Sequence, residues 1–200
     1  NNIVLTAKKL VESLIQENIS TQPIIYLDKK KIQKARNEYN FDNNFTHICI
    51  GFSASGPTKR WGIEKYIRLA EELNKKKRCK FYLAGGQNDK NLFKKFINSS
   101  VGSSCVSFED LTIQETLPII KNCNIYIGND TGWLHIASAL NIKSLALFMD
   151  SPVLAYGKYS KNILLVIPEG ETEESTSHST FGKDRINFDE VLKKSLELLG

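Results

Sequence analysis

The chain has 200 residues, of which 41% are hydrophobic and 24% are charged. These proportions are ordinary for a globular protein, and they exclude a collagen-like, mucin-like or wholly disordered chain. No uninterrupted apolar run approaches the roughly 20 residues that a helix needs to span a bilayer. The chain begins without Met and without a signal-peptide layout, so we expect it to start within a longer protein.

Positive charge is concentrated in the middle of the chain. Residues 45–168 contain sixteen Lys and Arg against nine Asp and Glu, whereas residues 169–200 contain four against eight. A basic middle segment fits an anionic partner, which is a phosphorylated small molecule, a nucleic acid or an anionic membrane. The alternative for the cluster at residues 75–78 is the charged end of a solvated helix. No nucleic-acid-binding motif is present, so we do not expect nucleic acid as the partner.

The four cysteines show no metal-binding spacing. They are Cys49, Cys79, Cys105 and Cys123, too far apart for a zinc pattern. Two of them lie in apolar runs, and we expect reduced, buried thiols rather than disulfides.

Residues 1–44 contain two helical patterns. Apolar side chains at helical spacing predict an amphipathic helix over residues 3–17, and residues 29–39 form a charged helical pattern. Between them, Pro23 opens an apolar stretch, residues 24–27, that fits either a strand or an extended linker. Turn-forming residues at 40–45 mark a boundary.

From residue 46, short apolar runs alternate with amphipathic helices. This alternation predicts an α/β fold, a Rossmann-like parallel sheet with helices on both faces. Residues 169–180 are acidic and rich in Ser and Thr, which predicts a mobile loop before a last amphipathic helix. Strands are expected at 47–52, 79–84, 124–127, 144–148 and 163–167, and helices at 63–76, 89–98, from 112, at 133–140 and at 187–199.

Two loops after predicted strands have the chemistry of an anion site. The first, residues 52–61, offers small residues, the hydroxyls of Ser53 and Ser55, and the positive charge of Lys59. It lacks the spacing of a Walker A loop, and a plain strand-to-helix turn with surface cations is the alternative. In parallel α/β sheets, ligands bind outside the carboxyl ends of the strands, where this loop is expected.

The second loop joins a strand to a helix at residues 128–135. Free backbone N–H groups of Thr131 and Gly132 at the helix start can hold a phosphate, and His135 projects close to that end. Asp130 either accepts from a sugar hydroxyl or caps the helix, and a buried structural histidine is the alternative for His135.

A third loop follows the strand at 79–84. Asp89 comes after Gly85-Gly86 and can accept from a ribose hydroxyl, as acidic residues do in nucleotide-binding folds. Simple helix capping is the alternative.

Together, these loops resemble glycosyltransferase family 9, the ADP-heptose:lipopolysaccharide heptosyltransferase family. The resemblance is carried by Lys59-Arg60-Trp61, by the Gly85-Gly86 turn, and by Asn129-Asp130-Thr131-Gly132 with His135 three residues on. It implies that 1–44 is the end of an N-terminal domain and its linker. Residues 45–168 would be the nucleotide-sugar-binding domain, and residues 169–200 the acidic loop and closing helix.

The resemblance implies that the chain is the C-terminal, donor-binding half of a GT-B glycosyltransferase. The enzyme would transfer a sugar with inversion at the anomeric carbon, and heptose is the first candidate for that sugar. The donor would be a nucleotide-sugar substrate, with ADP-heptose as the first candidate. The resemblance implies that the enzyme uses no cofactor and no obligatory metal. The acceptor would be a lipid-linked glycan of the lipopolysaccharide core at the cytoplasmic face of the inner membrane, with peripheral contact to that membrane through the helices at 29–39 and 63–76.

Residue roles also follow from the resemblance. Lys59 would stabilise the leaving diphosphate. The other donor-binding positions would be Ser53, Ser55, Asp89, Asp130, Thr131, Gly132 and His135.

Three departures from the family pattern stand out. Asp89 replaces the usual Glu, and Phe148-Met149 replaces Phe-Gly after a strand. Residues 1–44 match neither the family's general base nor its acceptor loop, so the base must come from the missing N-terminal domain. The alternative function is a non-catalytic, Rossmann-like nucleotide-sugar-binding or interaction module.

Overall fold

Runs of buried apolar residues become the strands of one parallel sheet, as the sequence predicted. The computed structural model describes residues 2–200. Its six strands lie in the order β3-β2-β1-β4-β5-β6, and every neighbouring pair is parallel. The strands are β1 (Thr46–Gly51), β2 (Cys79–Ala84), β3 (Cys105–Ser107), β4 (Ile125–Asn129), β5 (Lys143–Leu147) and β6 (Ile163–Val166).

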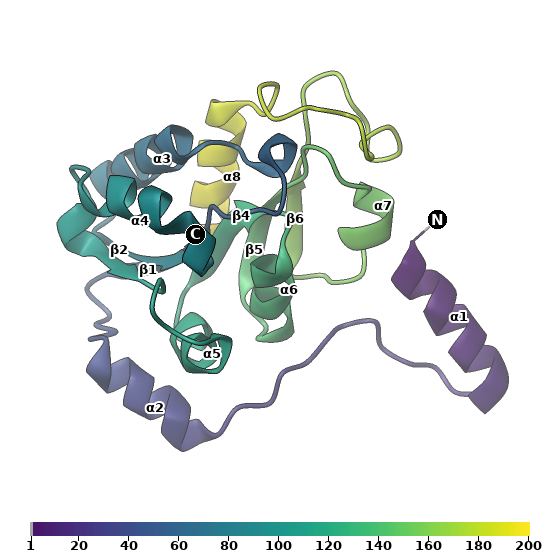
Figure 1. Cartoon of the computed structure of the whole chain (residues 1–200). Helices are drawn as coiled ribbons and strands as arrows, with labels where there is room; N and C mark the ends of the chain where they lie inside the picture. Colours follow the sequence, from purple (N-terminus) through teal and green to yellow (C-terminus); the bar gives the residue numbers. More distant parts are fainter. Residues whose placement is uncertain (1) are drawn as a thin grey trace.

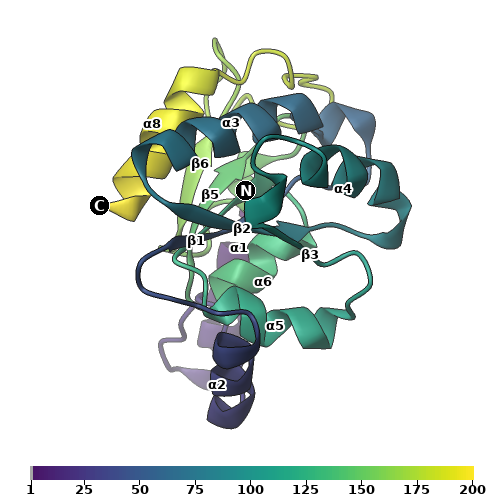
Figure 2. The ribbon, with the colours of Figure 1, turned by 90° about the vertical axis from the view of Figure 1, so that its left-hand side faces the viewer.

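Helices cover both faces of this sheet (Figure 2), which confirms the predicted fold class. On one face, α3 (Ile63–Lys76), α4 (Lys90–Ile97) and α8 (Phe188–Leu199) enclose one apolar cluster. On the other, α2 (Lys29–Glu38), α5 (Ile113–Lys121) and α6 (Gly132–Ala139) enclose the second. Because both faces are buried, the central strands are apolar throughout rather than alternating.

The strand order places a topological switch point between β1 and β4. From β1 the chain winds outward through β2 to β3, and it then returns to β4 and winds the other way. The loops that leave the carboxyl ends of β1 and β4 therefore diverge to opposite sides and leave a crevice between them. Ligands of open α/β sheets bind at this point. The first two candidate loops of the sequence leave these two strands.

The structure decides between the alternatives for residues 24–27, which are an extended linker and not a strand; the Ile25 N–H donates to the carbonyl of Ala139 at 2.9 Å. Other element predictions are corrected. Helix α4 begins at Lys90, because a short 3-10 turn at Gln87–Asp89 precedes it. Strand β3 and the short helix α7 (Val153–Tyr156) were not predicted.

Helix α1 (Ile3–Ile15) stands to one side of the sheet and joins α2 through a long extended segment (Figure 1). None of its residues is buried, and its apolar side chains Leu10 and Leu14 are 63% and 75% exposed. The predicted amphipathic helix therefore forms, but within residues 2–200 nothing covers the exposed side chains of its apolar face.

The segment between β6 and α8 has neither helix nor strand over residues 169–180. It is nevertheless tied to the domain, because Thr176 is buried and its carbonyl accepts from the Val153 N–H at 3.3 Å. The predicted mobility of this loop stays a prediction.

All four cysteines are free thiols, as predicted. Cys49, Cys79 and Cys123 are buried and Cys105 is half-buried. Burial raises the pKa of the Cys79 thiol to about 11 and that of Cys105 to about 12. Because the thiolate is the reactive form, these side chains serve as small apolar core groups.

Candidate functional site

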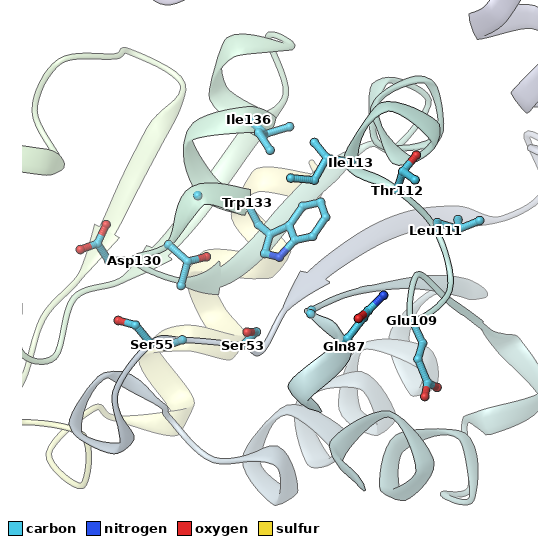
Figure 3. A pocket seen from close by; sticks show the side chains of 15 residues that line it. Ser53, Ser55, Gln87, Glu109, Leu111, Thr112, Ile113, Asp130, Trp133 and Ile136 are labelled. Carbon is cyan, nitrogen blue, oxygen red and sulfur yellow. The ribbon is translucent and has the colours of Figure 1, made fainter. Parts of the chain in front are cut away.

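A cavity of about 600 Å³ opens at the switch point. This volume lies within the range typical of small-molecule sites. The loop after β1 contributes Ser53 and Ser55, and the loop after β4 contributes Asp130, Thr131 and Gly132 (Figure 3). The structure therefore brings five of the predicted site residues together around one cavity.

The start of helix α6 faces this cavity. Thr131 is the N-cap residue with extended backbone, and Gly132 is the first helical residue and is exposed. The first N–H groups of a helix have no partners within it and carry partial positive charge. Because Gly132 has no side chain to cover them, an anionic group can approach these donors closely.

Asn129 holds the two loops together. This buried last residue of β4 donates through its Nδ2 to the carbonyl of Phe52 at 2.8 Å and to that of Ser53 at 3.3 Å. Its Oδ1 accepts from the Tyr66 hydroxyl at 2.8 Å. Because both the nitrogen and the oxygen of this buried amide have partners, it fixes the loop after β1 relative to the end of β4. Sequence reasoning assigned no role to Asn129; the signal was a polar residue ending an otherwise apolar strand.

Asp89 lies apart from the cavity. It is 4% exposed, and its Oδ2 accepts from the Gly86 N–H at 3.0 Å. The guanidinium of Arg60 lies 3.6 Å from its other oxygen, while Arg60 Nε donates to the Ala54 carbonyl at 2.9 Å. In this arrangement Asp89 shapes its own loop and, through Arg60, braces the loop after β1. Gly85, Gly86 and Gln87 line the cavity in its place.

Lys59 ends a 3-10 turn at Pro57–Lys59, and it does not line the cavity either. It lies close to Asp150, a buried residue after β5. Burial alone raises the pKa of Asp150. Hydrogen bonds from the Thr58 side chain and from the backbone of residues 179 and 181, together with the charge of Lys59, outweigh burial and lower that pKa. Asp150 is thus an ionised anchor for the turn that carries Lys59.

His135 lies behind the start of α6. Its Nε2 is 3.6 Å from Asp130 Oδ1, and its Nδ1 is hydrogen-bonded to the Tyr159 hydroxyl. Burial raises the pKa of Tyr159 to about 12, so this hydroxyl stays protonated at neutral pH. With partners on both ring nitrogens, the imidazole is held in one orientation beside the loop after β4. It lines a smaller, mainly apolar hollow together with Tyr156, not the main cavity.

The main cavity also has an apolar wall that sequence reasoning missed. Figure 3 shows the Trp133 indole at its centre, with Ile113 and Ile136 beside it. Trp133 follows the Asp-Thr-Gly signature directly, which was the available signal.

Within residues 2–200, no three His, Cys, Asp or Glu side chains gather in a way that could hold a metal ion. No helix within the same range is both long and apolar enough to cross a bilayer.

A six-stranded parallel sheet with helices on both faces and a crevice at its switch point defines a doubly wound, Rossmann-like α/β domain. The model of glycosyltransferase family 9 (heptosyltransferase) matches residues 2–183. The chain belongs to this family, as the three loops indicated.

Relatives and solved structures agree with this assignment. Lipopolysaccharide heptosyltransferase 1 of Campylobacter coli is 25% identical over 186 residues, which are 90% of this chain and 54% of that protein. Lipooligosaccharide heptosyltransferase 2 of Haemophilus influenzae is 28% identical over 158 residues, which are 73% of this chain and 45% of that protein. The chain thus spans about half the length of the curated relatives that it matches.

Among solved structures, ADP-heptose LPS heptosyltransferase II of E. coli superimposes with a TM-score of 0.74 at 21% identity, over 88% of this chain and 53% of that one. The family 9 glycosyltransferase of Veillonella parvula gives a TM-score of 0.73 at 18% identity, over the same shares. At these identities the likeness shows only that the folds are the same. The shared fold corresponds to about half of each of those chains.

Proposed function

We propose that this chain is the donor-binding half of a heptosyltransferase that acts in the synthesis of the lipopolysaccharide core. The observation that carries the proposal is the cavity at the switch point, where Ser53 and Ser55 face the start of α6. A diphosphate there would receive the hydroxyls of one loop and the backbone N–H groups of the other. A solved family relative, E. coli heptosyltransferase WaaC, was crystallised with ADP, which fits a nucleoside diphosphate as the common ligand.

In the proposed reaction, an acceptor hydroxyl oxygen bonds to the anomeric carbon of the donor sugar as the bond to the β-phosphate breaks. The nucleoside diphosphate leaves, and a base outside this chain takes the proton. Negative charge grows on the β-phosphate as that bond breaks, so a fixed positive charge beside it lowers the barrier. We assign this task to Lys59, which lies on the turn after β1 that Asp150 anchors. Asp130, which lines the cavity, would contact the transferred sugar, and His135, whose Nε2 lies 3.6 Å from Asp130 Oδ1, would assist from outside the main cavity.

The remaining partners belong to the same proposal. The missing half of the protein would supply the base and bind a lipid-linked glycan, and the exposed apolar face of α1 suits packing against it. Basic faces of α2 and α3 would give peripheral contact with the inner face of the cytoplasmic membrane. The donor would be a substrate, and no resident cofactor is part of the scheme.

Isothermal titration of the 200-residue chain tests donor binding directly. We expect ADP-heptose and ADP to bind. A folded sample that binds neither, nor any other nucleotide sugar, would overturn the proposal.

Turnover in the complete protein separates an enzyme from a non-catalytic binding module. Lys59→Ala should lower kcat by about 100-fold or more, the scale of losing one charge-stabilising group. Lys95→Ala is the matched control, because this lysine lies on the outer surface of α4, outside the proposed membrane contact, and pairs with Glu64 at 2.8 Å. Equal turnover of the two variants would refute the role of Lys59, and no turnover by the unmodified protein would favour the binding module.

A further inference from the structure

The cavity has two chemically different ends. Toward Ser55 and Gly132 its groups are polar, as a diphosphate requires. A second wall is apolar and consists of Leu111, Ile113, Trp133 and Ile136, although Gln87, Glu109 and Thr112 also line the cavity on that side. Ile113 is 55% exposed in spite of its size, so this wall is an uncovered apolar surface. Phosphates and sugar hydroxyls gain nothing from such a surface, whereas a flat, weakly hydrated ring does.

Trp133 is the aromatic residue of this wall. Its indole rests on the buried ring of Phe108, with the ring centroids 6.4 Å apart, and it is only half-buried. The other tryptophan, Trp61, is 2% exposed and stacks on Phe188, so it belongs to the core. Figure 3 shows the Trp133 ring projecting into the cavity between the helices and the loop that carries Gln87.

The position of Trp133 in the chain links the two ends. It directly follows Gly132, whose backbone is proposed to hold phosphate, so the aromatic side chain lies one residue from the anion-binding backbone. A nucleoside diphosphate has the matching layout, with a planar base at one end and charged oxygens at the other. A ligand with its phosphates on α6 therefore has its base within reach of this indole.

We infer that Trp133 is the platform on which the nucleobase of the donor stacks and which positions the donor in the cavity. The inference rests on the proposed function, because it takes a nucleotide-sugar as the ligand. Stacking on Trp133 would orient the donor, with its diphosphate at Ser55 and the start of α6 and its sugar toward Asp130. Base–aromatic stacking tolerates different bases, because every base presents a π-face.

The test compares ADP with ribose 5-diphosphate, which keeps the sugar and phosphates but lacks the base. Affinities are measured by titration calorimetry for the unmodified chain, Trp133→Leu and Trp133→Phe, with folding checked by circular dichroism. Leucine keeps apolar bulk against Phe108 but removes the aromatic face, whereas phenylalanine keeps a ring. Trp133→Leu should weaken ADP roughly 5- to 150-fold, the range for loss of one base–aromatic stack, and leave ribose 5-diphosphate unchanged. Trp133→Phe should retain most of the ADP affinity.

Each other outcome has a definite meaning. The role of Trp133 is overturned, while donor binding stands, if Trp133→Leu binds ADP as tightly as the unmodified chain does. The same holds if the unmodified chain binds ADP and ribose 5-diphosphate with equal affinity. If the folded, unmodified chain binds neither ligand, the proposed function itself fails. Tryptophan fluorescence gives an independent reading. ADP should quench the emission of the unmodified chain but not that of Trp133→Phe, in which Trp61 still emits.

Discussion

Asn129 belongs to the family signature, but its side chain has a structural role and does not face the cavity. It is fully buried, and it does not line the cavity. Its amide nevertheless spans from the loop after β1 to the Tyr66 hydroxyl on α3. The neighbouring Asp130 and Thr131 face the ligand side because Asn129 keeps the end of β4 in place.

Replacing Asn129 by leucine should destabilise the domain strongly. Leucine has a similar shape, but it leaves the Tyr66 hydroxyl and the Phe52 carbonyl buried without their partner. We expect the free energy of unfolding to fall by about 2–4 kcal/mol in urea titrations, since each orphaned polar group costs about 1–3 kcal/mol. Tyr66→Phe, which removes one partner only, should cost about 1 kcal/mol. An Asn129→Leu variant as stable as the parent would refute this account of the loop junction.

His47 introduces a pH dependence that is unrelated to the cavity. It lies buried in β1, with its ring nitrogens 3.0 Å from the Tyr82 hydroxyl and 2.9 Å from the Asp42 carbonyl. Burial lowers its pKa, and the hydrogen bond to the Asp42 carbonyl only partly opposes this shift. Near the ordinary histidine pKa of about 6.5, the unfolded chain therefore binds more protons than the folded one. Stability should be complete above that pH and fall as the pH is lowered through it.

Urea unfolding at pH 7.5 and at pH 5.5 measures this effect. The loss of stability between the two values should be smaller in His47→Gln than in the unmodified chain. His178→Gln, at an exposed position, is the matched control and should keep the full loss. The same loss in all three proteins would show that His47 does not contribute.

At the scale of elements, the last pair of β1 and β4 is glycine, and the Tyr126 side chain occupies the space that a Cβ would need. Gly51 pairs with Gly128, and the Tyr126 hydroxyl lies across both. A Cβ on Gly51 would lie 1.9 Å from that oxygen. The packing of Tyr126 at the end of these strands thus depends on two residues without side chains.

Gly51→Ala should lower the free energy of unfolding by about 1–3 kcal/mol or more, as other overpacked cores do. Gly56→Ala is the matched control, since a Cβ there would have the Thr58 hydroxyl oxygen, at 3.9 Å, as its nearest neighbour. Thermal and urea unfolding of both variants would check this expectation. Equal stability of the two would mean that Tyr126 has room to move away.

Sequence patterns predicted the long elements because their apolar spacing is set by burial, as in α3 and in strands β1, β2 and β4. They missed β3, whose three half-buried residues are too few to show a period. The candidate loops could be predicted because any helix start presents free backbone N–H groups. The directions of side chains could not be predicted from the sequence, because they depend on partners that are distant in the chain. Asp89 turns inward to Gly86 and Arg60, and Trp133 turns outward to the cavity.

At the scale of the whole molecule, the excess positive charge lies mostly on the surface of the helices. Lys75 and Lys95 pair with Glu72 and Glu64 on the outer faces of α3 and α4. Among the described residues that line the cavity, none is Lys or Arg. Backbone N–H groups and neutral side chains such as Ser53 and Ser55 are therefore the donors at this cavity, and the surface lysines contribute only a screened, long-range field.

Helix α1 should contribute little to the stability of the domain. It buries none of its residues, whereas the segment after it is attached: Thr21 donates to the Tyr159 carbonyl at 2.8 Å and Gln22 to that of Ser138 at 3.1 Å. Deleting residues 1–19 should therefore change the free energy of unfolding by less than about 1 kcal/mol, the range of ordinary surface changes. Deleting residues 1–39 also removes α2, whose Ala35 is buried in the apolar cluster shared with α5, and should destabilise clearly. Urea unfolding of the two truncated chains decides the matter, since a comparable loss in both would place α1 within the cooperative core.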